Sequence, residues 1–435
     1  MTLKLGLTTT VVISSSAMAR EALTKKDRRL AARPIRDATR ALGWSDRSVG
    51  WLPRSNPLWR TFRRVMATHI FSQRSLQQDT HGLRERTVRD LVRYLRGRSG
   101  QEVAVGRVLL SSTLNLTSNI LFSADIVDME GGSPERLLET LEAAIDPLMW
   151  KPNVSDIFPL LGPLDIQGRR RMAAAHLKKL FSFLEGVVDR RLAEVDDKHN
   201  NDFLDVLLDL MSTGEMARDD AIALMFDILI AGGDPMSTTV EWALAELLHN
   251  PSTMSKVRTE MAAASFGCNS KQAIEEADLI RLPYLQAVVK EMQRLHPVSP
   301  LTLPHKAIED GVEIGGYVIP KGGTVIINLS AVMRDPDVWE MPEEFVPERF
   351  IGTDGNVDMK GKDQFQYIPF GGGRRQCPGM ALSERVVPLV LASLLQAFEW
   401  HLPDGMTSDK MDMNEMFVSA NIRAVPLKAV PVVIM

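Results

Sequence analysis

The sequence predicts a mainly α fold with a small β region, an α+β class, and three observations lead to this expectation. Apolar residues recur at three- and four-residue spacing over most of the 435-residue chain, which is the period of an amphipathic helix. Alternating, β-branched segments are few and lie far apart in the sequence. Because no repeat, low-complexity tract or Gly/Ser linker divides the chain, we expect one large domain over residues 1–435.

The helices are expected wherever the apolar spacing persists. Pro251 separates two of them cleanly, since proline suits the first turn of a helix. The expected helices cover residues 16–26, 56–72, 80–97, 134–147, 168–196, 202–212, 217–249, 251–263 and 284–296.

The strand patterns occupy the two chain ends and one internal segment. Residues 2–7 alternate between apolar and polar side chains, and "GVEIGGYVIPKGGTVIINLS" (311–330) alternates around a turn at "PKGG". The last stretch, 417–435, is extended and apolar. We therefore expect a small sheet built from both chain ends and the 300–330 region.

Composition excludes some classes of protein. Fifty-one basic residues against 55 acidic ones give a net charge of −4, which does not suggest a nucleic-acid partner. The two cysteines, Cys268 and Cys377, form no disulfide framework and indicate a reducing compartment. No run approaches the roughly 18 consecutive apolar residues of a membrane span, and the N-terminus does not have the pattern of a signal peptide.

One apolar helix carries weak helical residues at its centre. In "ILIAGGDPMSTTVEWALAELL" (228–248), Pro235 cannot donate to the carbonyl of Ala231, at a cost of about 3 kcal/mol in a helix interior. The pattern predicts a local break near Gly232 and Pro235.

A glycine-rich loop before another long helix contains Cys377. In "FQYIPFGGGRRQCPGMALSERVVPLVLASLLQAFEW" (365–400), three glycines allow close approach to a flat ligand, and two arginines follow them. Pro378 suits a helix start, so Cys377 should lie at a helix N-terminus, where its pKa is expected to fall.

Three functions suit such a cysteine. A nucleophile needs a histidine, and none is adjacent; zinc needs three further nitrogen or sulfur ligands, which one other cysteine and eight scattered histidines supply poorly. A lone thiolate beside arginines suits haem, with sulfur on the iron and arginine on a propionate. The remaining alternative is a buried structural cysteine.

The motif Phe370-x-x-Gly373-x-Arg375-x-Cys377-x-Gly379 resembles the haem-binding signature of the cytochromes P450. The whole chain is similar to this family. The resemblance implies the cytochrome P450 fold, haem b as the cofactor, and Cys377 as the ligand of its iron.

Other motifs in the same order resemble that family. Trp59 and Arg63 match its Trp-x-x-x-Arg helix, which meets a propionate, and His305 stands where a further propionate contact is placed. Glu291 and Arg294, three apart on one helix, match its Glu-x-x-Arg, and Arg349 matches the arginine completing that ion-pair network.

The central helix resembles the family's oxygen-binding helix, and departs from it at one position. Gly232 and Asp234 match the pattern, but Pro235 stands where the family has a threonine whose hydroxyl helps to deliver protons during O–O cleavage. The resemblance therefore implies that protons come from Asp234 or from a substrate hydroxyl. Phenol-coupling members of the family also carry proline there.

Longer stretches, such as "LPYLQAVVKEMQRLHPVSPLTLPHKA", resemble plant members that hydroxylate monoterpenoids and diterpenoids, such as geraniol hydroxylase. They equally resemble the group acting on benzylisoquinoline alkaloids, including N-methylcoclaurine hydroxylase and phenol-coupling enzymes. The implied function is hydroxylation of a small hydrophobic plant secondary metabolite. Oxidative phenol coupling, an inactive relative and a non-enzymatic haem sensor are the alternatives.

The resemblance also implies partners and a location. Electrons would come from NADPH–cytochrome P450 reductase, docked on the cysteine side, and the other reactants would be dioxygen and a hydrophobic or aromatic substrate. Family members act as monomers on the cytosolic face of the endoplasmic reticulum membrane, held by an N-terminal helix and hinge that this sequence lacks. Pocket walls are expected at residues 40–56, 225–237, 299–303 and 416–420, with the apolar residues Met225, Leu229, Leu301, Leu303 and Phe417.

Overall fold

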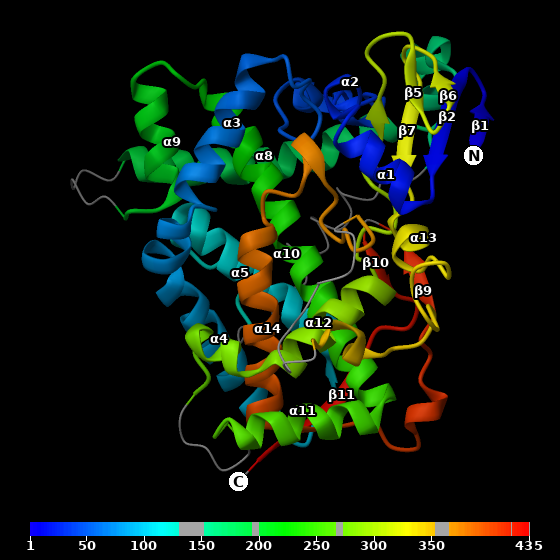
Figure 1. The fold of residues 1–435 in the computed structure, drawn as a ribbon. Coiled ribbons are helices and arrows are strands. Elements are labelled where there is room, and N and C mark those ends of the chain that lie inside the picture. The colour runs from blue at the N-terminus through cyan, green and yellow to red at the C-terminus, as the bar shows by residue number, and fades with distance from the viewer. Residues whose placement is uncertain (130–151, 194–199, 267–272, 353–364, 419, 435) are drawn as a thin grey trace.

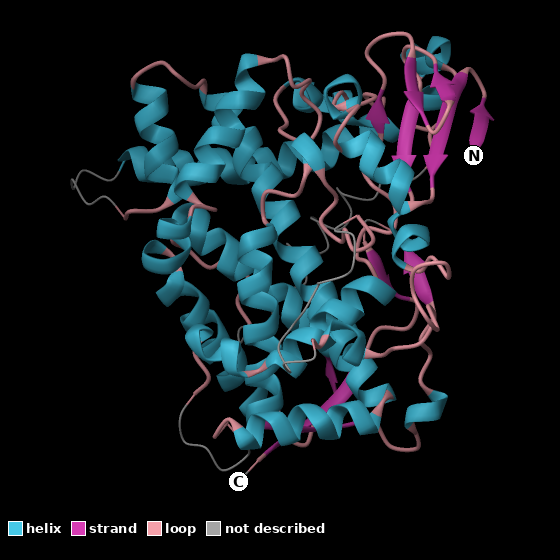
Figure 2. Ribbon diagram, viewed as in Figure 1, coloured by secondary structure: helices cyan, strands magenta, loops and turns pink. Residues whose placement is uncertain are grey.

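A computed structural model describes residues 1–129, 152–193, 200–266, 273–352, 365–418 and 420–434. Helices dominate these residues, and the strands lie at the edges of the molecule (Figure 2). The longer helices are α3 (Pro57–His69), α4 (His81–Arg96), α5 (Val105–Phe122), α8 (Arg169–Ala193), α9 (Phe203–Ser212), α10 (Arg218–His249), α11 (Pro251–Ala263), α12 (Pro283–Leu295) and α14 (Met380–Ala397). The expected mainly helical α+β class is confirmed.

Short helices connect these elements. They are α1 (Ser16–Leu23), α2 (Asp27–Leu30), α7 (Val154–Ile157) and α13 (Leu329–Met333), with the single-turn or irregular helices η1 (Ala38–Asp46), η2 (Ser75–Asp79), η3 (Pro159–Leu164), η4 (Glu276–Arg281), η5 (Pro347–Phe350), η6 (Gly373–Arg375) and η7 (Ser408–Lys410). The helix expected over 16–26 is α1, which begins at the expected residue and ends three residues early at Leu23, and the one expected over 134–147 lies outside the described residues.

The main sheet joins distant parts of the chain, as the sequence predicts. Its order is β1 (Thr2–Leu5), β2 (Thr8–Ile13), β7 (Thr324–Ile327) and β4 (His305–Lys306), and β2 runs parallel to β7 with Val11 opposite Val325. The blue N-terminal strands therefore lie beside yellow ones in Figure 1. This sheet positions His305 at its edge.

The expectation that the C-terminal segment joins the same sheet is wrong. Strand β11 (Lys428–Val433) pairs with β3 (Val103–Ala104) and β8 (Phe398–His401) at the opposite end of the molecule. The hairpins β5–β6 (Val312–Ile314, Tyr317–Ile319) and β9–β10 (Glu415–Phe417, Asn421–Arg423) form two further small sheets. Alternation of side chains identifies a strand, but it does not identify the strand's partner.

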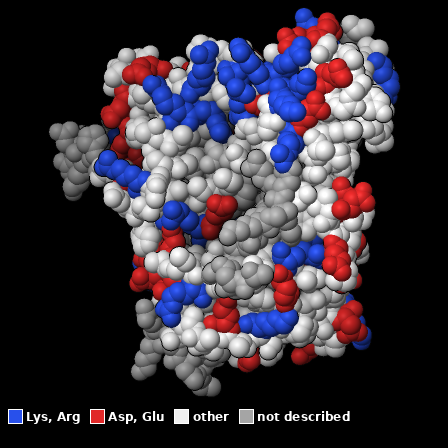
Figure 3. Space-filling model, in the orientation of Figure 1, with Lys and Arg blue, Asp and Glu red and all other residues white. Residues whose placement is uncertain are grey.

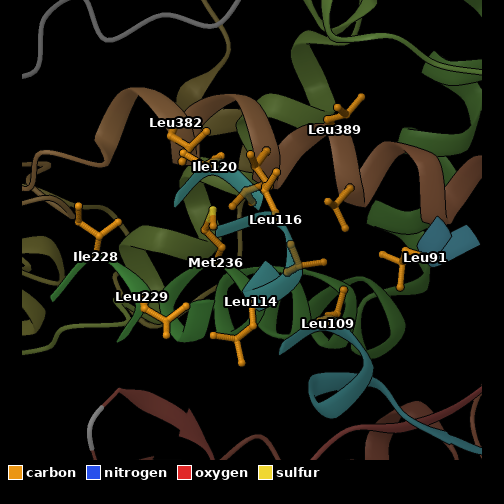
Figure 4. Packing of buried hydrophobic residues seen from close by; sticks show 14 of the residues in the cluster. Leu91, Leu109, Leu114, Leu116, Ile120, Ile228, Leu229, Met236, Leu382 and Leu389 are labelled. Carbon is orange, nitrogen blue, oxygen red and sulfur yellow. The ribbon is translucent and has the colours of Figure 1, made fainter. Parts of the chain in front are cut away.

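Helix α10 runs through the centre of the core. Side chains of α5, α10 and α14 interdigitate there, with Leu114 and Leu229 near one another and Met236 beside Ile120 (Figure 4). Among the described residues, α10 and α14 are long and apolar enough to cross a membrane, and 67% and 61% of their most apolar windows are buried inside the protein. Core burial accounts for the apolar composition of both helices.

Candidate functional site

The loop before α14 is fixed against the N-terminal helices. Its backbone turns at Gly371 and Gly373, with φ of +67° and +66°, and the amide of Cys377 donates to the carbonyl of Phe370 at 3.1 Å. A Cβ on Gly373 would lie 2.5 Å from the carbonyl oxygen of Leu23. Glycine at this position is required by α1, not by a ligand, because Gly373 does not line the cavity described next.

A cavity of about 480 Å³ separates this loop from α10. The side chain of Cys377 is accessible within it although protein surrounds the site. The structure brings together every candidate site residue except Gly373 around this one space: Trp59, Arg63, Gly232, Asp234, Pro235, His305, Phe370, Arg375, Cys377 and Gly379.

The thiol of Cys377 does not have the low pKa expected from its place at a helix N-terminus. Burial raises the pKa of Cys377, although the N–H groups of Gly379 and Met380 and the charge of Arg63 act in the opposite direction. Such a thiol is a poor nucleophile at neutral pH, whereas a coordinated metal ion deprotonates a thiol outright. Among the described residues, no group of three or more His, Cys, Asp or Glu could hold a metal ion.

Three arginines face the cavity and form no salt bridge with a carboxylate among the described residues. Arg375 donates to the carbonyls of Ala31 and Val49, at 2.8 and 3.2 Å, and Arg63 donates to that of Gln376 at 3.3 Å. Arg33 was not found from the sequence, because nothing around it forms a recognisable pattern. It donates to the carbonyl of Leu303 at 2.6 Å, and its Nε is buried without a partner.

These cations influence one another electrostatically. Burial and the charge of Arg375 lower the pKa of Arg33 to about 9, and burial and the charge of Arg63 lower that of Arg375 to about 10. Burial, Arg33 and Arg375 lower the pKa of His305 to about 3, so its ring is neutral, and its Nδ1 lies 3.1 Å from the carbonyl of Leu30. A group with two carboxylates would relieve this repulsion.

Trp59 holds part of the same wall. Its Nε1 donates to the carbonyl of Val49 at 3.1 Å, and the guanidinium of Arg375 lies 4.9 Å from the centre of its ring. The indole therefore positions Arg375 at the cavity by a cation–π contact.

Helix α10 is continuous through Pro235, so the predicted break is not observed. Tertiary packing overrides the low helix propensity of the segment. Ala231 and Pro235, one turn apart, are solvent-accessible although α10 lies in the core, because both residues face the cavity. A Cβ on Gly232 would lie 2.7 Å from Oγ1 of Thr117, so this glycine allows α5 to approach α10 closely.

Hydroxyl groups remain near Pro235 although the proline has none. Thr239, one turn later, donates to the carbonyl of Pro235 at 2.6 Å, and both Thr239 and Thr117 line the cavity. Oδ1 of Asp234 lies 3.4 Å from the hydroxyl of Thr238. The cavity wall therefore keeps an acid and two hydroxyls at its α10 side.

The expected substrate walls are partly correct. Residues 48–51, 230–232 and 302–303 line the cavity, including Leu303. Ala420 also lines it, whereas Leu301 does not. Met225 and Leu229 are instead buried on the core side of α10, and Phe417 is exposed on β9. The predicted ranges contain the elements that line the cavity. Which side chains of an element face the cavity depends on how that element is rotated about its axis.

The ion pair expected from the Glu-x-x-Arg motif is present and fully buried. Glu291 accepts from Arg294 at 2.7 and 2.9 Å and from Nε of Arg349 at 2.9 Å. Arg294 also donates to three backbone carbonyls, and its guanidinium lies 5.3 Å from the ring centre of Trp339. This network joins α12 to the segment that contains η5.

The donor set fits a flat metal-binding group that carries carboxylates. One thiol lies in the cavity, and three arginines beside it, in the part of the chain that the structure describes, donate hydrogen bonds only to backbone carbonyls. Nε of Arg33 has no hydrogen-bond partner. Sulfur coordination at one position and carboxylates opposite arginines are the features of haem bound through a cysteine thiolate. Fold and site together define a haem-thiolate protein.

Comparison with known proteins agrees with this class. The family model "Cytochrome P450" matches residues 1–425. The chain is 52% identical over 436 residues to "Cytochrome P450 76M5" and 50% identical over 436 residues to "Ent-cassadiene C11-alpha-hydroxylase 1", both of Oryza sativa subsp. japonica. These matches cover 100% of this chain and 85% and 86% of the relatives. The chain belongs to the cytochrome P450 family.

A more distant relative and a solved structure extend the comparison. "Geraniol 8-hydroxylase" of Catharanthus roseus is 41% identical over 443 residues, covering 99% of this chain and 86% of the relative. The structure titled "Zebra fish cytochrome P450 another structure with Progesterone" has a TM-score of 0.83 at 23% identity, covering 99% of this chain and 96% of that one. The fold is therefore that of the family, and the expected plant group is confirmed.

Proposed function

We propose that this cytochrome P450 hydroxylates a hydrophobic plant terpenoid, with a diterpenoid-sized hydrocarbon skeleton as the favoured substrate. The observation that carries the proposal is the 50% sequence identity to a relative named "Ent-cassadiene C11-alpha-hydroxylase 1", together with the apolar walls of the cavity. Ile120, Ile228, Val298 and Leu303 line it, and apolar walls with few polar groups suit such a skeleton.

The chain's own residues would hold the cofactor and orient the substrate. We assign Cys377 as the iron ligand and Arg33, Arg63, Arg375 and neutral His305 as the groups that bind the propionates. Bound there, haem supplies the dioxygen and one-electron chemistry that amino-acid side chains lack. The protein contributes a mainly apolar space that orients the substrate.

The proton supply would come from the α10 side of the cavity. Asp234 can hold a proton at its carboxylate, and the hydroxyl of Thr239 can relay one from beside Pro235. The loss of threonine at position 235 therefore leaves proton donors in the wall, which favours hydroxylation over phenol coupling.

The substrate proposal is tested by turnover of diterpene hydrocarbons, terpenoid alcohols and benzylisoquinolines under labelled dioxygen. Labelled oxygen in a diterpenoid product supports the proposal; an unlabelled, newly bonded phenolic product refutes it in favour of coupling. Pro235→Thr is compared with the native chain for coupling of electron use to product. An unchanged peroxide yield in that variant would contradict a role of this position in proton delivery.

The ligand assignment has a direct spectroscopic test. Cys377→Ala should abolish the absorption band of the reduced, carbon monoxide-bound protein that gives the family its name. Cys268→Ala is the matched control and should keep the band. A normal band in the Cys377 variant would refute the assignment.

We also propose NADPH–cytochrome P450 reductase as the electron donor. Lys and Arg side chains gather along the upper edge of the face shown in Figure 3, over α2, α3 and the segment leading to α14. Arg28 of α2 and Arg60 and Arg64 of α3 are exposed. Both helices lie against the loop of Cys377, because Asp27 of α2 pairs with Arg374 and Arg63 of α3 donates to the carbonyl of Gln376. A basic surface beside the electron-accepting site suits an acidic partner, so charge reversal at Arg60 and Arg64 should slow reduction most at low salt.

The proposed location is the cytosolic face of the endoplasmic reticulum membrane, with the single catalytic domain acting as a monomer. Exposed apolar side chains support the proposal that the protein contacts a membrane surface. Leu160 and Leu164 of η3 are 85% and 66% exposed, and Leu7 is 62% exposed. The amide of Leu7 donates to the carbonyl of Ile157, so these residues share one end of the molecule. Such a patch suits contact with lipid.

A further inference from the structure

A second hollow opens at the surface, on the other side of Trp44 from the main cavity. Its volume is about 290 Å³, and it lies between η1, α8 and the first half of α10. Phe181 and Ile222 form apolar walls, and Arg47 and Asp219 stand at its rim. Among the described residues, Trp44 alone lines both this hollow and the main cavity.

The indole of Trp44 is held by one carboxylate. Its Nε1 donates to Oδ1 of Asp227 at 2.8 Å, and Asp227 also accepts from the hydroxyl of Ser48 at 2.8 Å and the amide of Val49 at 2.7 Å. Asp227 thus bonds to three groups of the 44–49 segment. In the sequence Asp227 is the single acid in the otherwise apolar run "LMFDILI", which does not reveal its partners.

The packing around Trp44 is aromatic and continuous with the surface hollow. Phe226 meets Trp44 edge-on with ring centres 5.5 Å apart, and Phe181 meets Phe226 in the same way at 5.3 Å. Edge-to-face contacts are individually weak, of order 1 kcal/mol. The hydrogen bond to Asp227 is therefore the directional contact that fixes the indole.

The backbone before Trp44 departs from helical geometry. Leu42 and Gly43 have φ of +52° and +69°, and Ala41 is extended, so η1 is interrupted immediately before the indole. A left-handed leucine is sterically unfavourable, and Leu42 is half exposed at the hollow. This interruption is suited to act as a hinge.

The far end of the same segment is fixed independently. The carbonyl of Val49 accepts from Trp59 at 3.1 Å and from Arg375 at 3.2 Å. Rotation at residues 41–43 can therefore move Trp44 while Val49 keeps its contacts on the cofactor side.

We propose that Trp44 is the gate of an access route between the surface hollow and the main cavity, and that Asp227 is the positioning residue that holds it closed. The route would serve hydrophobic ligands larger than a single ring. The proposal rests on the proposed function only in that the main cavity holds the haem whose spectrum reports ligand arrival.

The test uses haem-loaded protein and two nitrogen ligands of different size, imidazole and clotrimazole. Stopped-flow absorbance gives their association and dissociation rates. Trp44→Ala should raise both clotrimazole rates about tenfold or more, a factor of the size that one lost buried hydrogen bond produces. Trp44→Phe and Asp227→Asn should give smaller increases of the same kind, and the imidazole rates should change little.

Two further variants keep the test decisive if the alanine variant folds poorly. Ser182→Trp places bulk in the surface hollow without touching the gate, since Ser182 lines only that hollow and is exposed; it should slow clotrimazole in both directions. Trp400→Phe is the matched control, because it also removes a buried indole hydrogen bond, to the carbonyl of Leu394 at 3.2 Å, whereas Trp400 lies on β8 and lines neither the hollow nor the main cavity. Its rates should stay near those of the native protein.

The outcomes separate the two proposals. Equal acceleration of imidazole and clotrimazole, acceleration by Trp400→Phe as large as by Trp44→Phe, or unchanged rates in both Trp44→Phe and Ser182→Trp would overturn the gate. Absence of any nitrogen-ligand spectrum in the native haem-loaded protein would instead contradict the haem site itself.

Discussion

Removal of the Glu291 carboxylate should destabilise the protein by about 3–5 kcal/mol, the cost of leaving a buried charge without its partner. The structure supports the upper part of this range. Glu291 and Arg294 are both completely buried, and Glu291 accepts from Arg294, Arg349 and the amide of Val346. In Glu291→Ala, Arg294 keeps its carbonyl partners but loses the only negative charge that it contacts among the described residues.

The assay is urea unfolding followed by circular dichroism, with recovery of signal on dilution checked, beside the haem content of the purified variant. Glu102→Ala is the matched control. Its carboxylate pairs with Lys428 at 2.9 Å, but both side chains are about half exposed, so the loss should stay below about 1 kcal/mol. A Glu291 variant as stable as the Glu102 variant, with full haem content, would refute this reasoning.

Two other outcomes follow from packing and titration. Gly232→Ala should lose up to about 2 kcal/mol, because crowding against Thr117 costs about 1–3 and the better helix propensity returns about 1; Thr117→Ala should restore most of the loss, and a stabilised single variant would contradict the steric explanation. Although burial disfavours the charged ring, hydrogen bonds to Glu246 and Glu415 raise the pKa of His296, so its stabilising effect is complete below about pH 6.5 and is lost as pH rises through the higher folded-state pKa. His296→Gln should flatten that part of the stability–pH curve, and an unchanged slope would show that another group titrates there.

Local patterns were predictable because their partners are close in sequence or have complementary charge. The turn before Cys377 and the pair of Glu291 and Arg294 are of this kind. Arg33 and Asp227 matter through contacts with residues far along the chain, and a single charged residue gives no information about such contacts.

Two wrong expectations share one physical cause. The pKa of Cys377 was expected to fall from its helix position alone, and Pro235 was expected to break its helix from propensity alone. Both arguments use local terms, whereas burial decides both outcomes. The solvent exposure of a thiol and the packing that supports a weak helical turn depend on the complete fold.

The loop of Cys377 lies against helices from the other end of the chain. Arg374 pairs with Asp27 at 2.6 Å, and Gly373 lies against the carbonyl of Leu23. At about 5–20 residues per second, synthesis from Leu23 to Gly373 takes roughly 20 to 70 s, so α1 is made long before the loop that packs against it. The cofactor-binding cavity, which residues of both segments line, is therefore complete only after the loop of Cys377 has been synthesised. Haem can bind at the full site only after that point.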